Sequence, residues 1–359
     1  MLKKEFLVIG GGPAGLAAAK TAARAGVEVL LLDRNIDIGG QLAKQTHRFF
    51  GAKKEHAGTR GYKIAEDFYH SLIEDGQVEI RTGATVLGIY QDGVITFADD
   101  GEFCKIRPKR VLVATGAQEK MLSFENNDLP GVYGAGAVQT LMNLYGVLPG
   151  KRVLMVGAGN IGLIVSYQLL QAGVAVAAIV EAAPKIGGYL VHAAKIRRAG
   201  VPIHTGTTVA RALGTEGVEG AVIQQLSERW EPVAGTERVL SVDTICLSAG
   251  LSPLVELLWQ AGCRMLYIPE LGGYVPWRDD ELRTSRQDIY VAGDAAGVEE
   301  ATSAILEGEL VGLAVAESLN YSVKSSKGLI KDKLASLRSG PMGEKVRQGL
   351  SRIRGEDDA

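Results

Sequence analysis

Three glycines near the start of the chain, Gly10, Gly12 and Gly15, have the spacing G-x-G-x-x-G. In such a turn the first glycine permits a tight bend and the second lets the backbone approach a pyrophosphate. The third lets the next helix, opened here by Pro13 and Ala14, pack closely on the preceding strand. The start of a helix also offers unpaired N–H donors and the positive end of its dipole. The pattern therefore predicts that backbone groups bind a dinucleotide.

The flanking segments supply the elements that such a turn requires. Residues 6–9 form an apolar run typical of a buried parallel strand, and a small-residue helix is expected over residues 14–25. A second apolar run, over residues 27–32, ends at Asp33, 18 residues after Gly15. A carboxylate there can accept hydrogen bonds from the two hydroxyls of a ribose. Strand, turn, helix, strand and acid in this order predict a dinucleotide site; a βαβ turn that binds nothing is the alternative.

The same pattern restarts in the middle of the chain. The apolar run 153–156 leads into a second G-x-G-x-x-G, and the following strand ends at Glu181, 19 residues past Gly162. The residues of this second site are Gly157, Gly159, Asn160, Ile161, Gly162 and Glu181. Three other stretches recur: residues 186–190 repeat 38–42, residues 203–209 repeat 79–86, and residues 244–250 repeat 111–116. The sequence thus predicts two related dinucleotide-binding units.

Composition excludes several classes of protein. The chain has 359 residues, enough for about two domains, and a net charge of −2, which gives no reason to expect a nucleic acid or an anionic membrane as partner. No apolar run approaches the roughly 20 residues that span a bilayer. The three cysteines are far apart and form no C-x-x-C pair, and no metal-ligand cluster is evident, so no metal site is expected. A reducing, cytoplasmic location is expected.

A late signal follows the second unit. The apolar strand 288–292 delivers Gly293 and Asp294 into a loop, and a small-residue helix is expected over residues 302–319. The acid lies just beyond a strand end, where a hydroxyl or phosphate could meet it; capping of a helix is the alternative. Beyond Asn320 the chain is rich in lysine and arginine, which predicts a solvated tail. A segment that docks onto a partner chain is the alternative for this tail.

These features together resemble the flavoproteins with two dinucleotide-binding domains, of the compact thioredoxin-reductase type, over residues 5 to 320. The resemblance implies an α/β fold of two Rossmann-like domains, each a three-layer ββα arrangement, with the second inserted in the first. It assigns residues 1–120 and 251–320 to an FAD-binding domain, 121–250 to a nucleotide-binding domain of the NAD(P) kind, and 321–359 to a basic C-terminal tail. The implied FAD-binding residues are Gly10, Gly12, Pro13, Ala14, Gly15, Asp33, Arg34, Gly40, Gln41, Leu42, Val86, Thr115, Gly116, Gly293, Asp294 and Thr302.

A narrower resemblance rests on Gly40-Gln41-Leu42 and on the G-D-A-A-G loop followed by Glu307-Gly308. These residues are similar to those of the flavin α-subunits of multisubunit amine and amino-acid dehydrogenases, such as opine oxidase and hydrogen cyanide synthase. The resemblance implies an oligomer with partner subunits that carry the substrate site or an iron–sulfur cluster. Longer members have a cysteine-rich [2Fe-2S] segment that this chain lacks. A free-standing NAD(P)H-dependent reductase and a non-catalytic nucleotide-holding scaffold are the alternatives.

The second site and the acid–base chemistry stay open at this level. Glu181 favours NAD(H), because a carboxylate repels the 2′-phosphate of NADP(H); ADP or ATP bound for structural reasons is another alternative, as is an empty site. His47 follows Gln41 by six residues and is the candidate catalytic acid or base, with a surface-loop histidine as the alternative. Arg48 and Arg60 are candidates for binding an anionic substrate. Thr302 and Ser303 are expected to cap the last helix.

Overall fold

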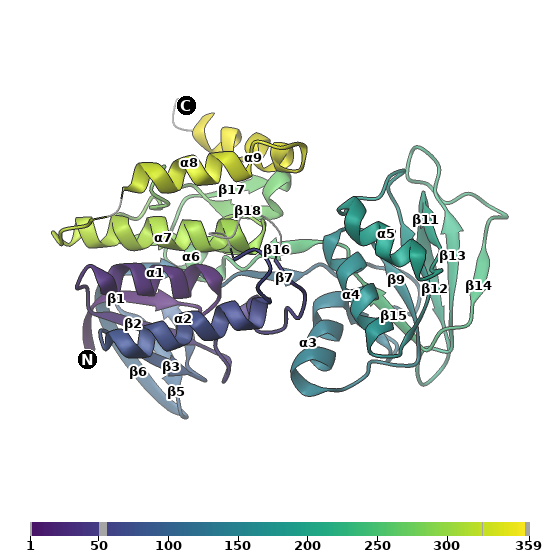
Figure 1. Cartoon of the computed structure of the whole chain (residues 1–359), viewed down its shortest axis with the longest axis horizontal. Helices are drawn as coiled ribbons and strands as arrows, with labels where there is room; N and C mark the ends of the chain where they lie inside the picture. Colours follow the sequence, from purple (N-terminus) through teal and green to yellow (C-terminus); the bar gives the residue numbers. More distant parts are fainter. Residues whose placement is uncertain (1, 50–55, 325, 356–359) are drawn as a thin grey trace. The chain divides into compact units, whose positions relative to one another are not determined.

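A computed structural model describes residues 2–49, 56–324 and 326–355. The chain divides into two compact units, one made of Met1–Gln118 and Leu251–Ala359 and the other of Glu119–Gly250 (Figure 1). The crossings between them are β7 (Ala117–Glu119) and β16 (Leu251–Pro253). The predicted α/β fold, with one Rossmann-like unit inserted in another, is confirmed.

The first unit is built on a sheet with the order β3-β2-β1-β6-β5-β4, and β19 also pairs with β6. Its strands are β1 (Leu2–Ile9), β2 (Val29–Asp33), β3 (Val78–Thr82), β4 (Thr85–Ile89), β5 (Ile95–Asp99), β6 (Glu102–Val113) and β19 (Ile289–Val291), with a separate hairpin of β17 (Met265–Ile268) and β18 (Gly273–Pro276). Strands β1, β2, β3, β6 and β19 run parallel. Their carboxyl ends therefore meet at one edge, which carries the first glycine turn and Asp33.

Helices cover one face of this sheet. They are α1 (Pro13–Arg24), α2 (Gly61–Asp75), α6 (Glu256–Gln260), α7 (Ala301–Ser318), α8 (Lys327–Leu337) and α9 (Glu344–Gly355), with the 3-10 turns η1 (Gly40–Leu42), η3 (Pro269–Leu271), η4 (Gly293–Ala295) and η5 (Pro341–Gly343). Successive side chains of a strand point to opposite faces. Phe6 and Val8 accordingly pack in the core beneath α1 and α7, whereas Leu7 and Ile9 pack in a separate core that includes residues of β4, β5 and α6.

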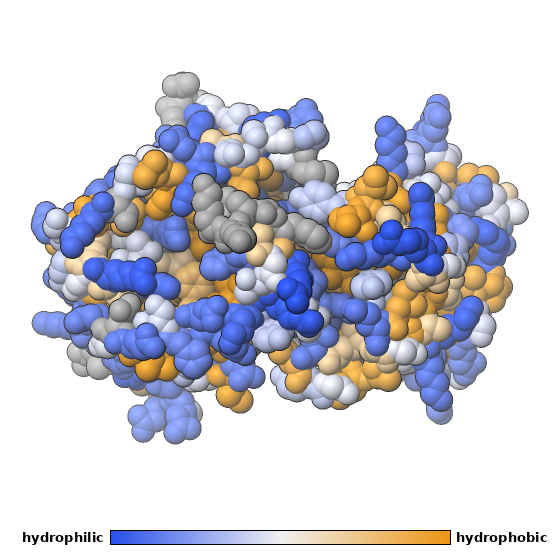
Figure 2. Space-filling view, in the orientation of Figure 1, coloured by the Kyte–Doolittle hydropathy of each residue, from blue (hydrophilic) through white to orange (hydrophobic). Residues whose placement is uncertain are grey.

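The second unit repeats this plan. Its parallel sheet has the order β11-β10-β9-β15-β8, and a second, antiparallel sheet contains β12, β13 and β14. The strands are β8 (Val132–Gly134), β9 (Arg152–Val156), β10 (Ala175–Glu181), β11 (Ile203–Thr205), β12 (Thr207–Leu213), β13 (Gly220–Gln225), β14 (Arg238–Leu240) and β15 (Thr244–Leu247), and the helices are α3 (Ala135–Tyr145), α4 (Asn160–Gln171) and α5 (Leu190–Arg198). Val153 and Met155 face the helices, and Leu154 and Val156 face the antiparallel sheet. Figure 2 shows apolar patches among the hydrophilic side chains of this unit's visible face.

Two local expectations need correction. The strand expected over residues 104–106 and the buried strand expected from residue 110 are one continuous strand, β6. One half of β6 pairs with β5 and the other half with β19, so a single strand serves both the hairpin and the parallel sheet.

The prediction of a solvated basic tail is wrong for the described residues after 320. They form α8 and α9, which lie beside α7 in Figure 1. Ile330 and Leu334 of α8 are buried in the main core of the first unit, and Ile353 of α9 is buried in a smaller cluster with Ile268 and Leu271. The abundant lysine and arginine residues concealed this apolar spacing, because their charged ends reach solvent while one helical face stays apolar.

Candidate functional site

The first glycine turn has the conformation that pyrophosphate binding requires. Gly10 has a φ of +107°, and a Cβ there would lie 2.3 Å from the carbonyl oxygen of Ala114. A Cβ on Gly15 would lie 1.8 Å from the carbonyl oxygen of Gly10. At Gly12, in contrast, a Cβ would meet no protein atom within 4 Å. The turn is therefore tightly packed at its first and third glycines and open at its second, which fits the close approach of a phosphate group.

Asp33 holds this turn from the end of β2. Its side chain is buried, and its Oδ2 accepts a hydrogen bond of 2.6 Å from the backbone N–H of Gly11, while Oδ1 accepts one of 2.7 Å from Asn35. A carboxylate has about four lone-pair positions, so two remain for ribose hydroxyls. The neighbouring Arg34 is exposed. Asp33 thus lies where the dinucleotide interpretation requires a carboxylate.

The segment Gly39 to Leu42 lies against the same turn. The Gly39 N–H donates to the Gly11 carbonyl at 2.8 Å, and Gly40, with a φ of +52°, places its Cβ position 2.9 Å from Gly12 Cα. Leu42 is buried, whereas Gln41 is exposed. The tertiary structure therefore brings Gly40 to Gly12.

The late Gly-Asp motif reaches this edge from β19. Gly293, with a φ of +69°, places its Cβ position 3.1 Å from Ala14 Cβ, in the first turn of α1. Asp294 accepts a 3.2 Å hydrogen bond from the N–H of Glu299. Burial, together with the negative charges of Glu307 and Glu299, raises the pKa of Asp294 to about 6. The structure thus places Gly293 and Asp294 beside the first glycine turn.

Three other predicted residues are accounted for by the structure. Thr115 donates through its hydroxyl to the Leu254 carbonyl at 2.7 Å, and Gly116, with a φ of +77°, accepts from the Leu254 N–H at 2.9 Å. Val86 lies on β4 and packs against the core that contains Ile9. Thr115 and Gly116 therefore fasten the end of β6 to the returning chain, and Ala114 just before them contacts the glycine turn.

The expectation that Thr302 and Ser303 cap α7 is wrong. The N-cap residue is Glu300, and no side-chain capping hydrogen bond occurs there. The Ser303 hydroxyl instead hydrogen-bonds the Glu299 carboxylate. Thr302 lies in the first turn of α7 and is half-buried.

The second glycine turn reproduces the first hydrogen bond for hydrogen bond. Glu181 accepts from the N–H of Ala158 at 2.7 Å and from that of Ala183 at 3.0 Å, as Asp33 does from Gly11 and Asn35. Gly157 has a φ of +107°, and a Cβ on Gly162 would lie 2.2 Å from the Gly157 carbonyl oxygen, whereas a Cβ on Gly159 would meet nothing within 4 Å.

The start of α4 completes this second turn. Asn160 accepts from the Tyr189 N–H at 2.8 Å, and Ile161 is exposed. Both turns therefore have the same open position and the same buttressing acid.

The polar loop before α2 contains the remaining candidates. The His47 ring stacks on Phe49 with centroids 6.2 Å apart. Arg48 and Arg60 are paired through a backbone bridge, and Arg48 donates to the Gly58 carbonyl at 3.0 Å. Of the residues predicted for this loop, Phe50 lies outside the described residues. The fold brings the two arginines together, and the contacts of His47 assign it no catalytic part.

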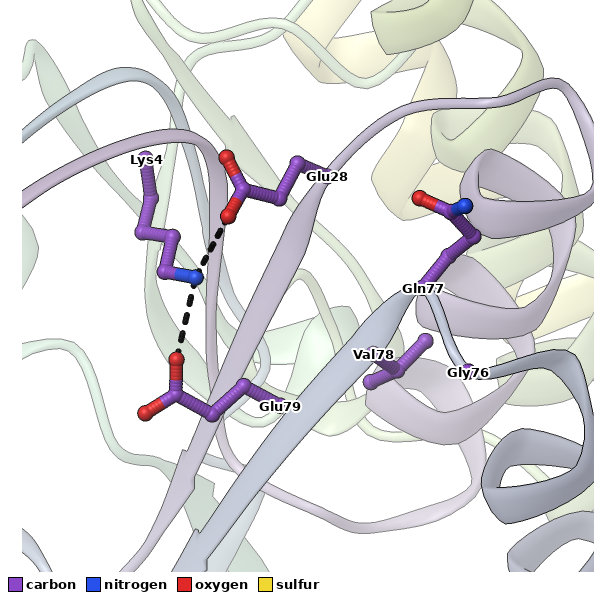
Figure 3. A pocket seen from close by; sticks show the side chains of 6 residues that line it. All are labelled: Lys4, Glu28, Gly76, Gln77, Val78 and Glu79. Carbon is purple, nitrogen blue, oxygen red and sulfur yellow. Dashed lines mark hydrogen bonds and ion pairs between the residues drawn. The ribbon is translucent and has the colours of Figure 1, made fainter.

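A hollow elsewhere in the first unit does not belong to the site. It measures about 380 Å³ and is lined by Lys4, Glu28, Gly76, Gln77, Val78 and Glu79 (Figure 3). Lys4 pairs with Glu28 at 2.6 Å and with Glu79 at 3.0 Å. These residues lie at the amino ends of the parallel strands, opposite the glycine turn, so the hollow is closed by ion pairs.

Metal and thiol chemistry have no centre in the part of the chain that the structure describes. No group of three or more histidine, cysteine, aspartate or glutamate side chains there could hold a metal ion. The three cysteines are free, and burial raises the thiol pKa of both Cys246 and Cys263. Within the same residues, no helix is long and apolar enough to cross a membrane.

A buried charged cluster behind the Gly293–Asp294 loop escaped the sequence analysis. It consists of Arg278, Glu299, Glu307 and Arg338. Arg338 donates to Glu299 at 2.7 and 3.0 Å and to Glu307 at 2.7 Å. Glu307 carried a signal through the resemblance to dehydrogenase subunits, but Arg338 was one cation among many in the expected tail.

This geometry, two Rossmann-like units with intact glycine turns, defines a dinucleotide-dependent flavoprotein of the oxidoreductase type. The chain belongs to the pyridine nucleotide-disulphide oxidoreductase family, whose model matches residues 4–308. It is an FAD-dependent oxidoreductase.

Curated relatives include components of multisubunit enzymes. The chain is 29% identical to the large A component of the opine oxidase of Rhizobium meliloti, over 94% of this chain and 77% of the relative. It is 29% identical to the alpha chain of the sarcosine oxidase of a Corynebacterium species, over 88% of this chain and 33% of the relative. It is 26% identical to the HcnB component of the hydrogen cyanide synthase of Pseudomonas aeruginosa, over 86% and 70%.

Solved structures show the same fold. The L-proline dehydrogenase of P. horikoshii matches with a TM-score of 0.71 and 24% identity, over 93% of this chain and 59% of that chain. The thioredoxin reductase of T. acidophilum matches with a TM-score of 0.72 and 22% identity, over 88% and 99%. The predicted resemblance is confirmed.

Proposed function

We propose that this chain is the flavin-carrying subunit of a multisubunit dehydrogenase or oxidase that oxidises an amine or an amino acid. Two kinds of observation support the proposal. The chain is similar over most of its length to subunits named for opine, sarcosine and cyanide-forming enzymes. The described residues hold a complete dinucleotide cradle but neither a metal cluster nor an exposed pair of thiols.

The FAD site of this proposal lies in the first unit. Backbone N–H groups of the turn around Gly12 would hold the pyrophosphate, Asp33 the ribose, and Asp294 the ribityl hydroxyls. Bound FAD supplies two-electron chemistry, taking electrons from a reduced donor and passing them to an acceptor. The protein's part is to position the cofactor and exclude water from it. Arg48 and Arg60 would attract an anionic substrate or product.

The second turn would bind NAD(H). The matched geometry at Gly159 and Glu181 supports this assignment, since Glu181 occupies the ribose position with a negative charge that a 2′-phosphate would meet at close range. ADP or ATP would satisfy the same turn, because they share its phosphate chemistry.

A free-standing NAD(P)H-dependent reductase is the second candidate. The intact second turn and the 99% coverage of a thioredoxin reductase chain favour it. The buried Cys246 and Cys263 speak against a dithiol mechanism, because burial suppresses the reactive thiolate.

Rapid mixing of the FAD-loaded chain with NADH or NADPH separates these functions. The subunit proposal expects the visible absorbance of the oxidised flavin to persist with either nucleotide until partner subunits and an amine or amino acid are added. Bleaching on mixing with NADH alone would establish the reductase. Copurification of the native chain, followed by identification of its polypeptides and nucleotides, names the partners.

A further inference from the structure

The described residues that follow α7 reach back to the loop that carries Asp294. Arg338 caps the carboxyl end of α8, and its guanidinium is largely buried. It donates to both carboxylate oxygens of Glu299, at 2.7 and 3.0 Å, and to one oxygen of Glu307, at 2.7 Å. One cation from the C-terminal segment therefore joins two buried acids.

These acids hold the loop at both ends. The other carboxylate oxygen of Glu307 accepts from the Gly293 N–H at 2.9 Å, and the Glu299 N–H donates to the Asp294 carboxylate at 3.2 Å. The chain of contacts from Arg338 to Gly293 and Asp294 thus contains no exposed link, since the side chain of Glu307 is 4% exposed and that of Glu299 10%.

Charge balance explains why the cation is required. Burial and Glu307 raise the pKa of Glu299, and Arg338 opposes this rise. Burial lowers the pKa of Arg338, but Glu307 and Glu299 outweigh it, and the pKa is raised. The only other cation that faces these acids among the described residues is the buried Arg278, whose pKa burial lowers. Without Arg338, three close carboxylates, Asp294 included, would share one distant cation.

We propose that Arg338 is a positioning residue of the FAD site: it balances Glu299 and Glu307 so that they hold Gly293 and Asp294 in the conformation that receives FAD. The C-terminal segment is then part of the flavin site. The inference rests on the assignment of this unit's site to FAD.

Other contacts of the segment agree with this part. Gly349 of α9 packs on Leu271, whose carbonyl accepts the N–H of Val298, four residues after Asp294. Both helices after α7 are therefore connected to the same loop.

The test is FAD affinity, measured by fluorescence titration of the full-length apoprotein at pH 6 and pH 8. R338M should raise the Kd for FAD at pH 8 by about tenfold or more, because a buried charged group loses its partner. The loss should shrink at pH 6, since protonation of Glu299 and Glu307 then replaces the missing cation; the charged groups that face them are Asp294 and Arg278. A loss caused only by poorer packing would be the same at both pH values and would overturn the proposal.

The matched control is R352M. Arg352 lies on α9, pairs with Glu270 at 2.8 Å and is half-exposed, so its replacement should leave the Kd unchanged. The double variant E299Q/R338M removes one charge of each sign and restores the net charge of the cluster. It should bind FAD within about threefold of the wild type at pH 8, and it replaces R338M as the decisive variant if R338M does not fold.

The outcomes are distinct. Wild-type affinity of R338M at pH 8, or a double variant that folds but binds as weakly as R338M, would overturn the part assigned to Arg338 alone. A wild-type apoprotein that takes up no FAD at all would instead overturn the assignment of the site.

Discussion

Gly12 and Gly15 belong to one motif but meet different physical requirements. A methyl group at Gly15 would overlap the carbonyl oxygen of Gly10, whereas one at Gly12 would enter open space. Gly15 is thus required by the fold of the turn itself, and Gly12 by what the turn is expected to bind.

The variants G12A and G15A should therefore separate stability from binding. G12A should change the free energy of unfolding of the apoprotein by less than about 1 kcal/mol and still lose FAD affinity, because its methyl group occupies the approach of the pyrophosphate. G15A should lose about 3 kcal/mol of stability through overpacking. Chemical denaturation and FAD titration of both variants measure these effects, and equal destabilisation by the two would contradict the distinction.

Asp294 should make stability depend on pH. Its folded pKa of about 6 exceeds the ordinary value of 3.8, so the unfolded chain releases this proton first as pH rises. The group therefore costs stability progressively between about pH 4 and pH 6, and the full cost persists above that window. D294N should accordingly stabilise the apoprotein by about 2 kcal/mol at pH 7.5, with the gain disappearing near pH 4. Urea denaturation at the two pH values measures it; a gain independent of pH would contradict the pKa shift.

At the scale of elements, α1 and α7 are held close by glycines on α7. A Cβ on Gly308 would lie 2.1 Å from the Ala14 carbonyl oxygen, and one on Gly312 would lie 2.8 Å from that of Ala18. The first turn of α1, which carries the expected phosphate donors, is therefore set by its packing against α7.

Replacement of Gly308 should act on binding through this contact. G308A should push the first turn of α1 away from α7, lower the apoprotein's stability by about 1–3 kcal/mol and weaken FAD binding. The control is G340A, because Gly340 has a φ of −73° and open space at its Cβ position. Thermal unfolding and FAD titration compare the two. Unchanged FAD affinity in G308A would show that α7 does not set the turn.

At the scale of the whole molecule, each unit has its own glycine turn and its own acid. Because the turns are on separate compact units, a substitution in one should leave ligand binding by the other intact. G159A is the counterpart of G12A: it should abolish the thermal stabilisation by NAD(H) and leave the FAD affinity unchanged. Differential scanning fluorimetry with each ligand measures this. Loss of FAD from G159A would contradict the independence of the sites.

Much of this architecture follows from the sequence alone. The two glycine motifs, the acids at 33 and 181 and the repeated stretches predict two Rossmann-like units, because a turn between strand and helix depends on residues close together in the chain. Local rules of this kind need no knowledge of distant contacts.

Only the tertiary structure decided the rest. It placed Gly293 against Ala14, joined the two halves of β6 into one strand, and turned the expected tail into helices that deliver Arg338 to Glu299 and Glu307. No sequence pattern marks this cation among its exposed neighbours, since its burial depends on segments about 30 to 40 residues away packing around it, and it is stable there only because two acids meet it.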